Sequence, residues 1–387
     1  MHSKIRFLAI GAVVGGMLLL AGQPGAAQQP AETKTAEQVY KNIQVLKGIP
    51  AEQINVSMHL VVGELGVDCT YCHVDHDPEH FALDDNPRKQ ISRKMMIMMM
   101  DLNKSSFAGQ QAVTCYTRHQ GHPKPVGTLV LPLPASVDRV IDLEADQAPA
   151  SVIPGVDEIL SRYVQALGGA EAIRKVASRV ITAIVNIPTA GNGGRIALPA
   201  QVEKYQKAPD LNVTIAHVAN GTLLDGFDGK TAWVQNLRGA VTDLAPSIDQ
   251  MRARRTADFY EPLDLKQEYS RMEVAGIESV NGHDAYELIG YPANDKPERL
   301  YFDVLTGLLL RKITVLPSPL GDSPFQVDYD EYRKTSSGVR YPFAINMTPA
   351  SARSEPSTHA RMLVQKVQDN VSIEDAKLAR PQSGAAQ

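Results

Sequence analysis

Apolar residues recur at helical spacing through the first third of the chain. Thr35 and Gln38 form a capping-box pattern, and the apolar positions after them predict a helix that runs to Leu46. A second helix is predicted over 51–65, where one face is apolar and Gly66 ends the periodic pattern. These two elements predict a small all-helical unit at the start of the chain.

A methionine-rich stretch predicts a third helix. Five methionines fall in six consecutive positions, so they cannot all face one way on a helix. Met95 aligns with Met98 and Met99 on one side, and Met96 and Met100 lie on another. Most of these side chains are expected to be flexible packing residues.

The second half of the chain alternates strand and turn signals. It begins with a helix predicted over 156–167, which Gly168 ends, and a short helix over 170–176. The predicted strands and turns that follow are 180–187, 202–205, 213–217, a turn over 225–230, 231–234, 286–290 paired with 299–304, a turn at 306–307, 308–315, 326–332 and 340–345. Pro342 interrupts the last strand and predicts a sheet edge there.

A stretch of repeated prolines separates these two patterns. We predict a helical domain over 34–126, an extended proline-rich linker over 127–154 and a β domain over 155–380. The chain has 387 residues, which agrees with two domains. The fold class predicted is therefore α+β, with a small all-α domain followed by an antiparallel sheet domain with an N-terminal helix.

Composition and charge narrow the functional classes. The formal net charge is −4, and no basic excess indicates a nucleic-acid partner. Three cysteines cannot build a disulfide scaffold. The composition is that of an ordinary globular chain.

The first residues have the pattern of a signal peptide. Lys4 and Arg6 precede an apolar run over 7–21, and small residues at 25–27 offer a cleavage site. We predict a signal peptide over 1–27 and a periplasmic mature protein. An uncleaved membrane anchor is the alternative, although the run is shorter than the roughly 20 residues that a spanning helix needs.

Cys69, Cys72 and His73 form the attachment signature of a c-type haem. Each thiol can add to one haem vinyl group, and the adjacent histidine can then bind the iron. The sequence therefore predicts one covalently bound haem c. A pair of cysteines at this spacing also occurs in redox thiols and zinc sites.

Met58 is the candidate second axial ligand, since it stands on the helix that leads into the attachment turn. Thioether–imidazole ligation favours reduced iron and suits an electron carrier. The alternative is that Met58 is a flexible core residue. His59, His76 and His80 compete for the same role.

A second, altered motif follows the methionine-rich helix. Cys115 and His119 have the attachment spacing, but Arg118 stands where the second cysteine would be. Three outcomes are open: a haem held by one thioether, a haem bound without a covalent link, or no haem. In the last case Cys115 is simply a thiol.

The two helix-then-attachment units resemble the photosynthetic reaction-centre cytochrome c subunit family over residues 34–126. Members are periplasmic multihaem electron donors, and each haem typically has a helical methionine opposite the motif histidine. The resemblance assigns Cys69, Cys72, His73 and Met58 to the first haem. It assigns Cys115, His119 and Met95 to a second haem. This stretch holds only two of the haem units expected of a full reaction-centre subunit, and homologues also occur outside photosynthesis.

Several stretches of the second half resemble the lipoprotein-carrier (LolA-like) superfamily. They are 227–233, 280–286, 301–308 and 327–333, and their order along the chain carries the resemblance. Such domains are curved antiparallel sheets whose concave apolar face can hold lipid. Taken singly, Asp228-Gly229 and Thr306-Gly307 are hairpin turns.

The sequence shows no arrangement of catalytic residues, so we expect an electron carrier rather than an enzyme. Its partners would be redox proteins at the membrane or in the periplasm. The alternative is a lipid- or hydrophobic-ligand-binding protein with an accessory haem domain. A haem enzyme such as a peroxidase would need an open iron site, and a zinc site would use the three cysteines with a histidine.

Overall fold

The computed structural model describes residues 34–75, 77, 79–125, 153–191, 194–219, 221–244, 248–350 and 359–381. The predicted signal peptide over 1–27 lies outside these residues, and so do 127–152 of the predicted linker and His76. No helix in the described part of the chain is long and apolar enough to cross a membrane.

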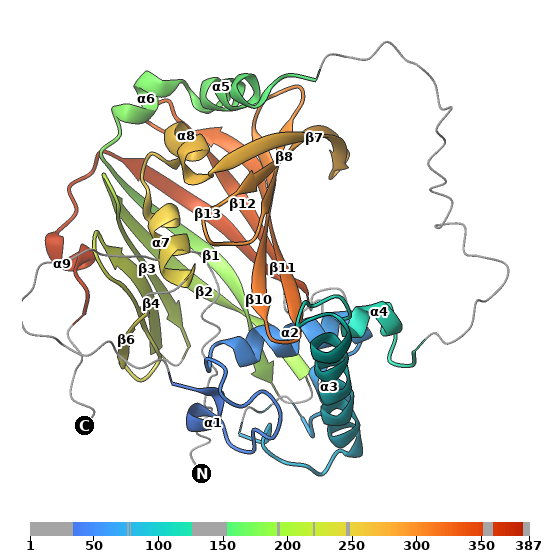
Figure 1. Cartoon of the computed structure of the whole chain (residues 1–387). Helices are drawn as coiled ribbons and strands as arrows, with labels where there is room; N and C mark the ends of the chain where they lie inside the picture. The colour runs from blue at the N-terminus through green and yellow to red at the C-terminus, as the bar shows by residue number, and fades with distance from the viewer. Residues whose placement is uncertain are drawn as a thin grey trace, which may run out of the picture.

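The chain forms a helical part followed by a sheet part, and the predicted α+β fold class is confirmed (Figure 1). The helices of the first part are α1 (Ala36–Val39), α2 (Gln53–Leu65), the 3₁₀ turn η1 (Cys69–Tyr71), α3 (Pro87–Ser106) and α4 (Cys115–His119). The helices of the second part are α5 (Val156–Leu167), α6 (Ala170–Arg174), α7 (Ile248–Ala257), α8 (Glu261–Asp264), η3 (Leu265–Glu268) and α9 (Asp375–Leu378).

Thirteen strands form one antiparallel sheet in the order β6-β5-β4-β3-β2-β1-β13-β12-β11-β10-β9-β8-β7. The strands are β1 (Ser178–Gly191), β2 (Gly194–Lys207), β3 (Leu211–Val218), β4 (Gly221–Asp228), β5 (Ala232–Gln235), β6 (Val241–Asp243), β7 (Arg271–Val280), β8 (His283–Tyr291), β9 (Glu298–Asp303), β10 (Leu309–Ser318), β11 (Gly321–Lys334), β12 (Arg340–Pro349) and β13 (Ala360–Asp369). Strands β1 to β6 run in order from the middle of the sheet to one edge. The chain then passes through α7 and α8 to the opposite edge, and β7 to β13 run in order from that edge back to the middle.

The main core lies between the sheet and the helices on its inner face. In β9, Leu300 and Phe302 point to this face because alternate residues of a strand share a face, and both are fully buried. Ile159, Tyr163 and Leu167 of α5 pack against them from above. The apolar stripe predicted over 156–167 is therefore the stripe that closes the core.

The helix predicted from Thr35 to Leu46 is much shorter in the structure. The capping box at Thr35 is present, but α1 ends at Val39 and the chain turns back, with Leu46 at a φ of 65°. The amide of Ala36 donates to the carbonyl of Ile49 at 2.8 Å. A continuous helix over this stretch would be about 18 Å long and could not return to its own start.

The edge predicted at Pro342 is wrong, because β12 lies between β11 and β13. Pro342 pairs with Tyr332 of β11, whereas the pairing with β13 covers only Ala344–Met347. The proline thus lies beyond the stretch where β12 needs hydrogen bonds on both sides.

The predicted turn over 225–230 is also partly wrong, since Asp225 lies within β4 and the turn begins only at Gly229. Asp225 stands in one row across the sheet with Lys204 and Thr214. Burial raises the pKa of Asp225 to about 7, and the nearby Lys204 offsets part of this effect.

This raised pKa predicts a stability that falls with rising pH. Between about pH 4 and pH 7 the carboxyl of Asp225 is ionised in the unfolded chain but keeps its proton in the folded one. The free energy of unfolding should therefore decrease by roughly 2–4 kcal/mol across this window. Asp225→Asn should flatten that slope and stabilise the protein above pH 7, as measured by denaturant titrations at several pH values. An unchanged slope would contradict the assignment.

Candidate haem site

The attachment turn follows α2 directly and is fixed by its own side chains. Gly66 ends α2 in the left-handed region, at φ 63°, and a Cβ there would lie 2.0 Å from the carbonyl oxygen of Gly121. Asp68 then caps η1: its Oδ1 accepts from the amide of Tyr71 at 3.1 Å and from the hydroxyl of Thr70 at 2.6 Å. This local geometry places Cys69 and Cys72 on one tight turn.

Helix α3 holds the same turn from outside. The Asn86 side chain caps α3 and donates from Nδ2 to the carbonyls of Thr70 at 3.3 Å and Tyr71 at 3.0 Å. The sulfur of Cys72 lies 3.1 Å from the hydroxyl of Ser92, six residues further along α3. The side chains of Asp68, Asn86 and Ser92 therefore hold the turn that carries both thiols.

His73 is prepared to act as a neutral ligand. Burial lowers the pKa of His73 to about 4, and the positive charges of Lys89 and Arg93 also disfavour its protonation. Its Nδ1 is buried and has no hydrogen-bond partner among the described residues. The ring packs against Phe81 with centroids 4.6 Å apart. A neutral imidazole keeps a lone pair for a metal at physiological pH.

These residues fit a covalently bound haem. All three cysteines are described, and they carry thiols rather than disulfides. Met58 is partly buried on α2 and packs against the core cluster of the helical part. The donor set is thus two thiols on one turn, a neutral imidazole beside them and a thioether on the helix that leads into the turn.

A zinc site is not formed by the same residues. Within the described ranges, no group of three or more histidine, cysteine or acidic side chains is placed to hold a metal ion. The alternative that joined the three cysteines with a histidine therefore lacks a structural counterpart there.

The second motif has a different environment. Thr114 caps the short helix α4, and the carboxyl group of Glu64 on α2 lies against Thr114 and Cys115. Burial, and then the Glu64 charge, raise the pKa of Cys115 to about 12. Burial also raises the pKa of Glu64, which is 7% exposed. The Cys115 thiol is therefore protonated and partly buried, and it packs against the core cluster of the helical part.

His119 nevertheless has the orientation of a metal ligand. Its Nδ1 lies 2.9 Å from the carbonyl oxygen of His122, which only accepts, so Nδ1 donates and Nε2 keeps the lone pair. Arg118 is exposed. Met95 is partly buried and lies outside the core cluster that takes Met96 and Met99. Met98 and Met99 were predicted to lie on one side of the helix, but their exposure differs. Met99 is buried, whereas Met98 is 47% exposed.

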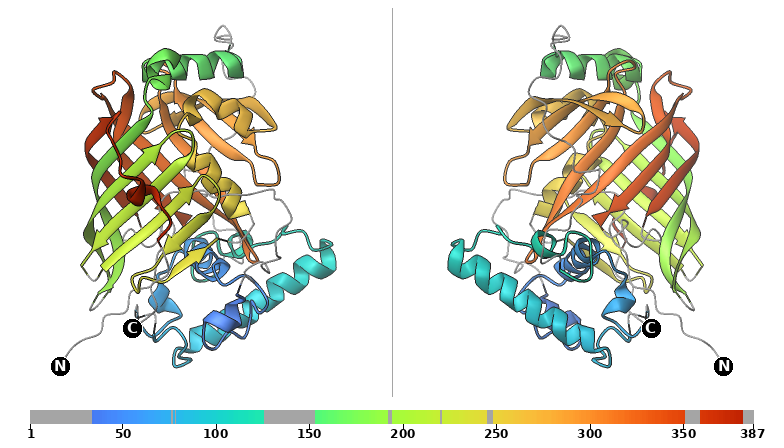
Figure 2. Two further views of the ribbon diagram at one scale, coloured as in Figure 1. Left: turned by 90° about the vertical axis from the view of Figure 1, so that its left-hand side faces the viewer. Right: turned by 90° about the vertical axis from the view of Figure 1, so that its right-hand side faces the viewer.

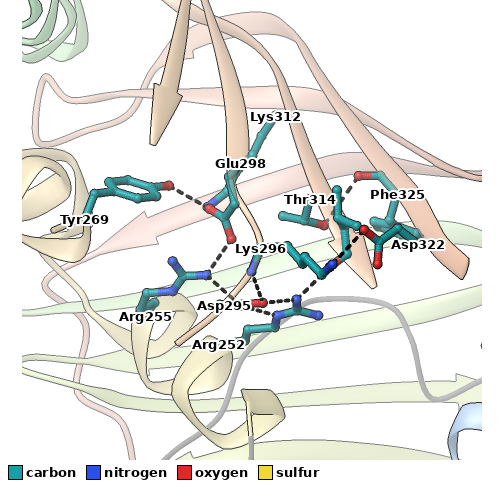
Figure 3. Close-up of polar contacts among 11 residues, drawn as sticks. Arg252, Arg255, Tyr269, Asp295, Lys296, Glu298, Lys312, Thr314, Asp322 and Phe325 are labelled. Carbon is teal, nitrogen blue, oxygen red and sulfur yellow. Dashed lines mark hydrogen bonds and ion pairs between the residues drawn. The ribbon is translucent and has the colours of Figure 1, made fainter. Parts of the chain in front are cut away.

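A groove of about 780 Å³ lies between the helical part and the sheet. Leu60, Glu64 and Tyr116 line its helical side, and Lys296 and Asp322 line its sheet side. Lys296 and Asp322 form an ion pair at 2.9 Å, which Figure 3 shows. The groove is therefore an open junction between the two parts of the chain.

The inner face of the sheet carries a charged network rather than a continuous apolar surface (Figure 3). Arg252 of α7 binds Asp295 through two hydrogen bonds of 2.6 and 2.7 Å. Glu298 accepts from Arg255 at 2.5 Å and pairs with Lys312 at 3.2 Å. Burial alone would raise the pKa of Glu298, but Lys312 and Arg255 outweigh it and lower the pKa to about 2. These pairs fasten α7 to the sheet.

Comparison with known proteins finds a family match that covers the helical part and extends into α5. Residues 20–165 match the family model of the photosynthetic reaction centre cytochrome C subunit. This region is a domain of that family.

Two relatives show how far the cytochrome domain matches. The photosynthetic reaction center cytochrome c subunit of Thermochromatium tepidum is 35% identical over 94 residues, which are 23% of this chain and 22% of that protein. The corresponding subunit of Rubrivivax gelatinosus is 27% identical over 147 residues, which are 35% of this chain and 39% of that protein. The chain thus spans well under half the length of these relatives.

Two solved structures are similar to the sheet part of the chain. A LolA superfamily protein from Nitrosomonas europaea has a TM-score of 0.41 and 12% identity, with 59% of this chain and 99% of that chain covered. A putative outer membrane lipoprotein-sorting protein domain from Vibrio parahaemolyticus has a TM-score of 0.40 and 11% identity, with 57% and 94% covered.

The sequence did not predict the roles of one residue of the cytochrome domain and two residues of the sheet domain. Glu64 gave no signal, because its contact with Cys115 depends on how α4 folds against α2. Arg252 and Arg255 were missed because α7 was not predicted, although their i, i+3 spacing places both on one helix face.

Proposed function

We propose that this chain is a periplasmic c-type cytochrome that carries electrons through one haem attached to Cys69 and Cys72. The observation that carries the proposal is the attachment turn itself, where two thiols and a neutral His73 stand together in a domain of a cytochrome family. The domain's family implies covalent haem, and such haems serve electron transfer when both axial positions are filled.

The chain's own residues would set the properties of this site. Haem, when bound, supplies iron that changes between the ferrous and ferric states. His73 would hold the iron through its neutral ring, and Met58 would favour the reduced state. Phe81 covers one side of the His73 ring, and the Asn86 contacts keep the turn in place. Little reorganisation of the protein is then needed when an electron arrives or leaves.

The second motif is proposed to leave the chain with a single covalent haem. Arg118 replaces the second cysteine of this motif, and the remaining Cys115 thiol is partly buried against Glu64. His119 and Met95 stay the predicted ligands of any haem bound there without two thioethers.

Redox proteins at the membrane or in the periplasm are the proposed partners.

A reversible spectral change tests the function directly. The exported protein should show a c-type absorption spectrum that sharpens on chemical reduction and returns on oxidation by a small-molecule oxidant. A chain whose spectrum does not change between these conditions would not be an electron carrier.

A role of the sheet domain in binding lipid or another hydrophobic ligand stays an alternative prediction. Buried Leu288, Leu300 and Phe302 provide apolar surface on the inner face, but α5 and α8 already cover it. Mass spectrometry of organic extracts from the purified protein would test this role, which requires a ligand at a fixed ratio to the chain.

A further inference from the structure

One residue of the sheet domain belongs to the core of the cytochrome domain. Leu320 lies in the two-residue loop between β10 and β11 and is fully buried. It packs in the cluster formed by helical residues, including Leu60, Leu65 and Met99. Figures 1 and 2 show the ends of β10 and β11 reaching α2. The helical core is therefore incomplete without this hairpin.

Two glycines allow the sheet domain and the helical part to come this close. A Cβ on Gly321 would lie 3.1 Å from Leu60 and 3.3 Å from Thr114, and its φ is +147°. A Cβ on Gly63 of α2 would lie 2.6 Å from the carbonyl oxygen of Ala350, just after β12. The two domains therefore meet closely at two points: backbone lies against backbone at Gly63, and the side chains of Leu60 and Thr114 lie against the backbone of Gly321.

Hydrogen bonds hold the hairpin in the shape that this contact needs. The Ser318 hydroxyl donates to the carbonyl of Gly321 at 2.8 Å and accepts from the amide of Leu320 at 3.3 Å. From the cytochrome side, Nε2 of Gln111 donates to the carbonyl of Ser318 at 2.8 Å. The loop that carries Leu320 is therefore preorganised and tied to the cytochrome domain.

The sheet domain contacts the side of α2 that lies opposite Met58, at Leu60 through the hairpin and at Gly63 through Ala350. With 3.6 residues per turn, Leu60 and Gly63 lie roughly 140–200° around the helix from Met58. A support on this back face limits how far the helix can move away from the attachment turn. Because the helix carries the thioether, its position decides how well the sulfur reaches the iron.

We infer that the sheet domain positions α2 so that Met58 can bind the haem iron, through Leu320 of the β10–β11 hairpin and through the contact of Gly63 with Ala350 after β12. This inference rests on the proposed function and assigns the sheet domain a part in setting the haem's sixth ligand. Loosening the hairpin should release Met58 without removing either thioether bond.

Leu320→Ala and Gly63→Ala test the inference in the full haem-loaded chain. Ferric haem with a thioether ligand has a weak long-wavelength charge-transfer absorption, which disappears when the sulfur leaves the iron. Both variants should lose a large part of this absorption and have a lower reduction potential, while covalent haem content stays at the wild-type level. Alanine normally favours a helix over glycine, so weakened ligation in Gly63→Ala would point to the contact with Ala350.

Leu300→Ala is the matched control, because Leu300 is equally buried but belongs to the core of the sheet domain. It should lower the unfolding temperature and leave the absorption and the potential unchanged below that temperature. Wild-type absorption and potential in both test variants would overturn the inference and leave the proposed function intact. A wild-type chain with haem but without the absorption would overturn the inference together with the Met58 assignment. A wild-type chain without haem would overturn the proposed function as well.

Discussion

A chain with both Cys69 and Cys72 replaced by alanine is expected to reach the periplasm without covalently bound haem. The two thiols stand on one turn that Asp68 and Asn86 hold in place, and no other described pair of cysteines has this spacing. Losing both removes both bonds to the haem. Haem-dependent peroxidase staining of a denaturing gel, in which only covalently attached haem survives, should therefore fall to background.

Cys115→Ala is the control for this experiment, because it also removes a cysteine thiol from the cytochrome domain. It should keep the full haem signal, since Arg118 stands where the second cysteine of that motif would be. Persistent staining of the double variant would show that Cys115 attaches haem alone. Loss of staining in Cys115→Ala would show that the second motif takes part in attachment.

The second large effect is expected from Met58→Leu. Leucine has nearly the same volume, so the core around α2 should stay packed, with a loss in stability under about 1.5 kcal/mol. The iron, however, loses a ligand that favours its reduced state. We expect the reduction potential to fall by on the order of 0.1 V, a fraction of the ≈ 0.8 V over which axial ligands set haem potentials. A spectroelectrochemical titration measures this shift.

Met100→Leu is the matched control for Met58→Leu. Met100 is also partly buried and packs against the same core cluster, but it lies on α3. Its replacement should leave the potential within experimental error of the wild type. Equal shifts in the two variants would indicate a general packing effect, and an unchanged potential in Met58→Leu would exclude Met58 as a ligand.

The attachment turn could be predicted because its chemistry is local. Cys69, Cys72 and His73 adjoin one another, and Gly66 marks the end of α2 in the sequence as it does in the structure. The capping box at Thr35 could also be predicted from the sequence. The end of the helix that it starts could not be predicted, because the closure of the loop on Ile49 depends on tertiary contacts.

The junction of the two domains could not be predicted for the same physical reason. Gln111 and Ser318 are 207 positions apart in the chain, and no periodic pattern relates them. Leu320 stands in a two-residue hairpin loop, where a leucine would ordinarily be solvent-exposed. Only the assembled fold shows that it completes the cytochrome core.

The place of β12 in the sheet could not be predicted from Pro342. A proline within a strand pattern indicated an edge, yet β12 lies inside the sheet. It tolerates Pro342 because its pairing with β13 begins only at Ala344. The order of strands depends on the whole sheet. A proline therefore shows only that one backbone hydrogen bond is missing, and it does not show whether its strand lies at an edge.

The number of haems per exported chain tests the central claim most directly. A pyridine haemochrome assay combined with the intact mass gives the haem content and the covalently attached mass of the same sample. The proposed function predicts one haem per chain and a mass increase of one haem on the processed polypeptide. A chain without haem would contradict the assignment as a cytochrome, and two covalent haems would contradict the proposal that Cys115 carries no haem.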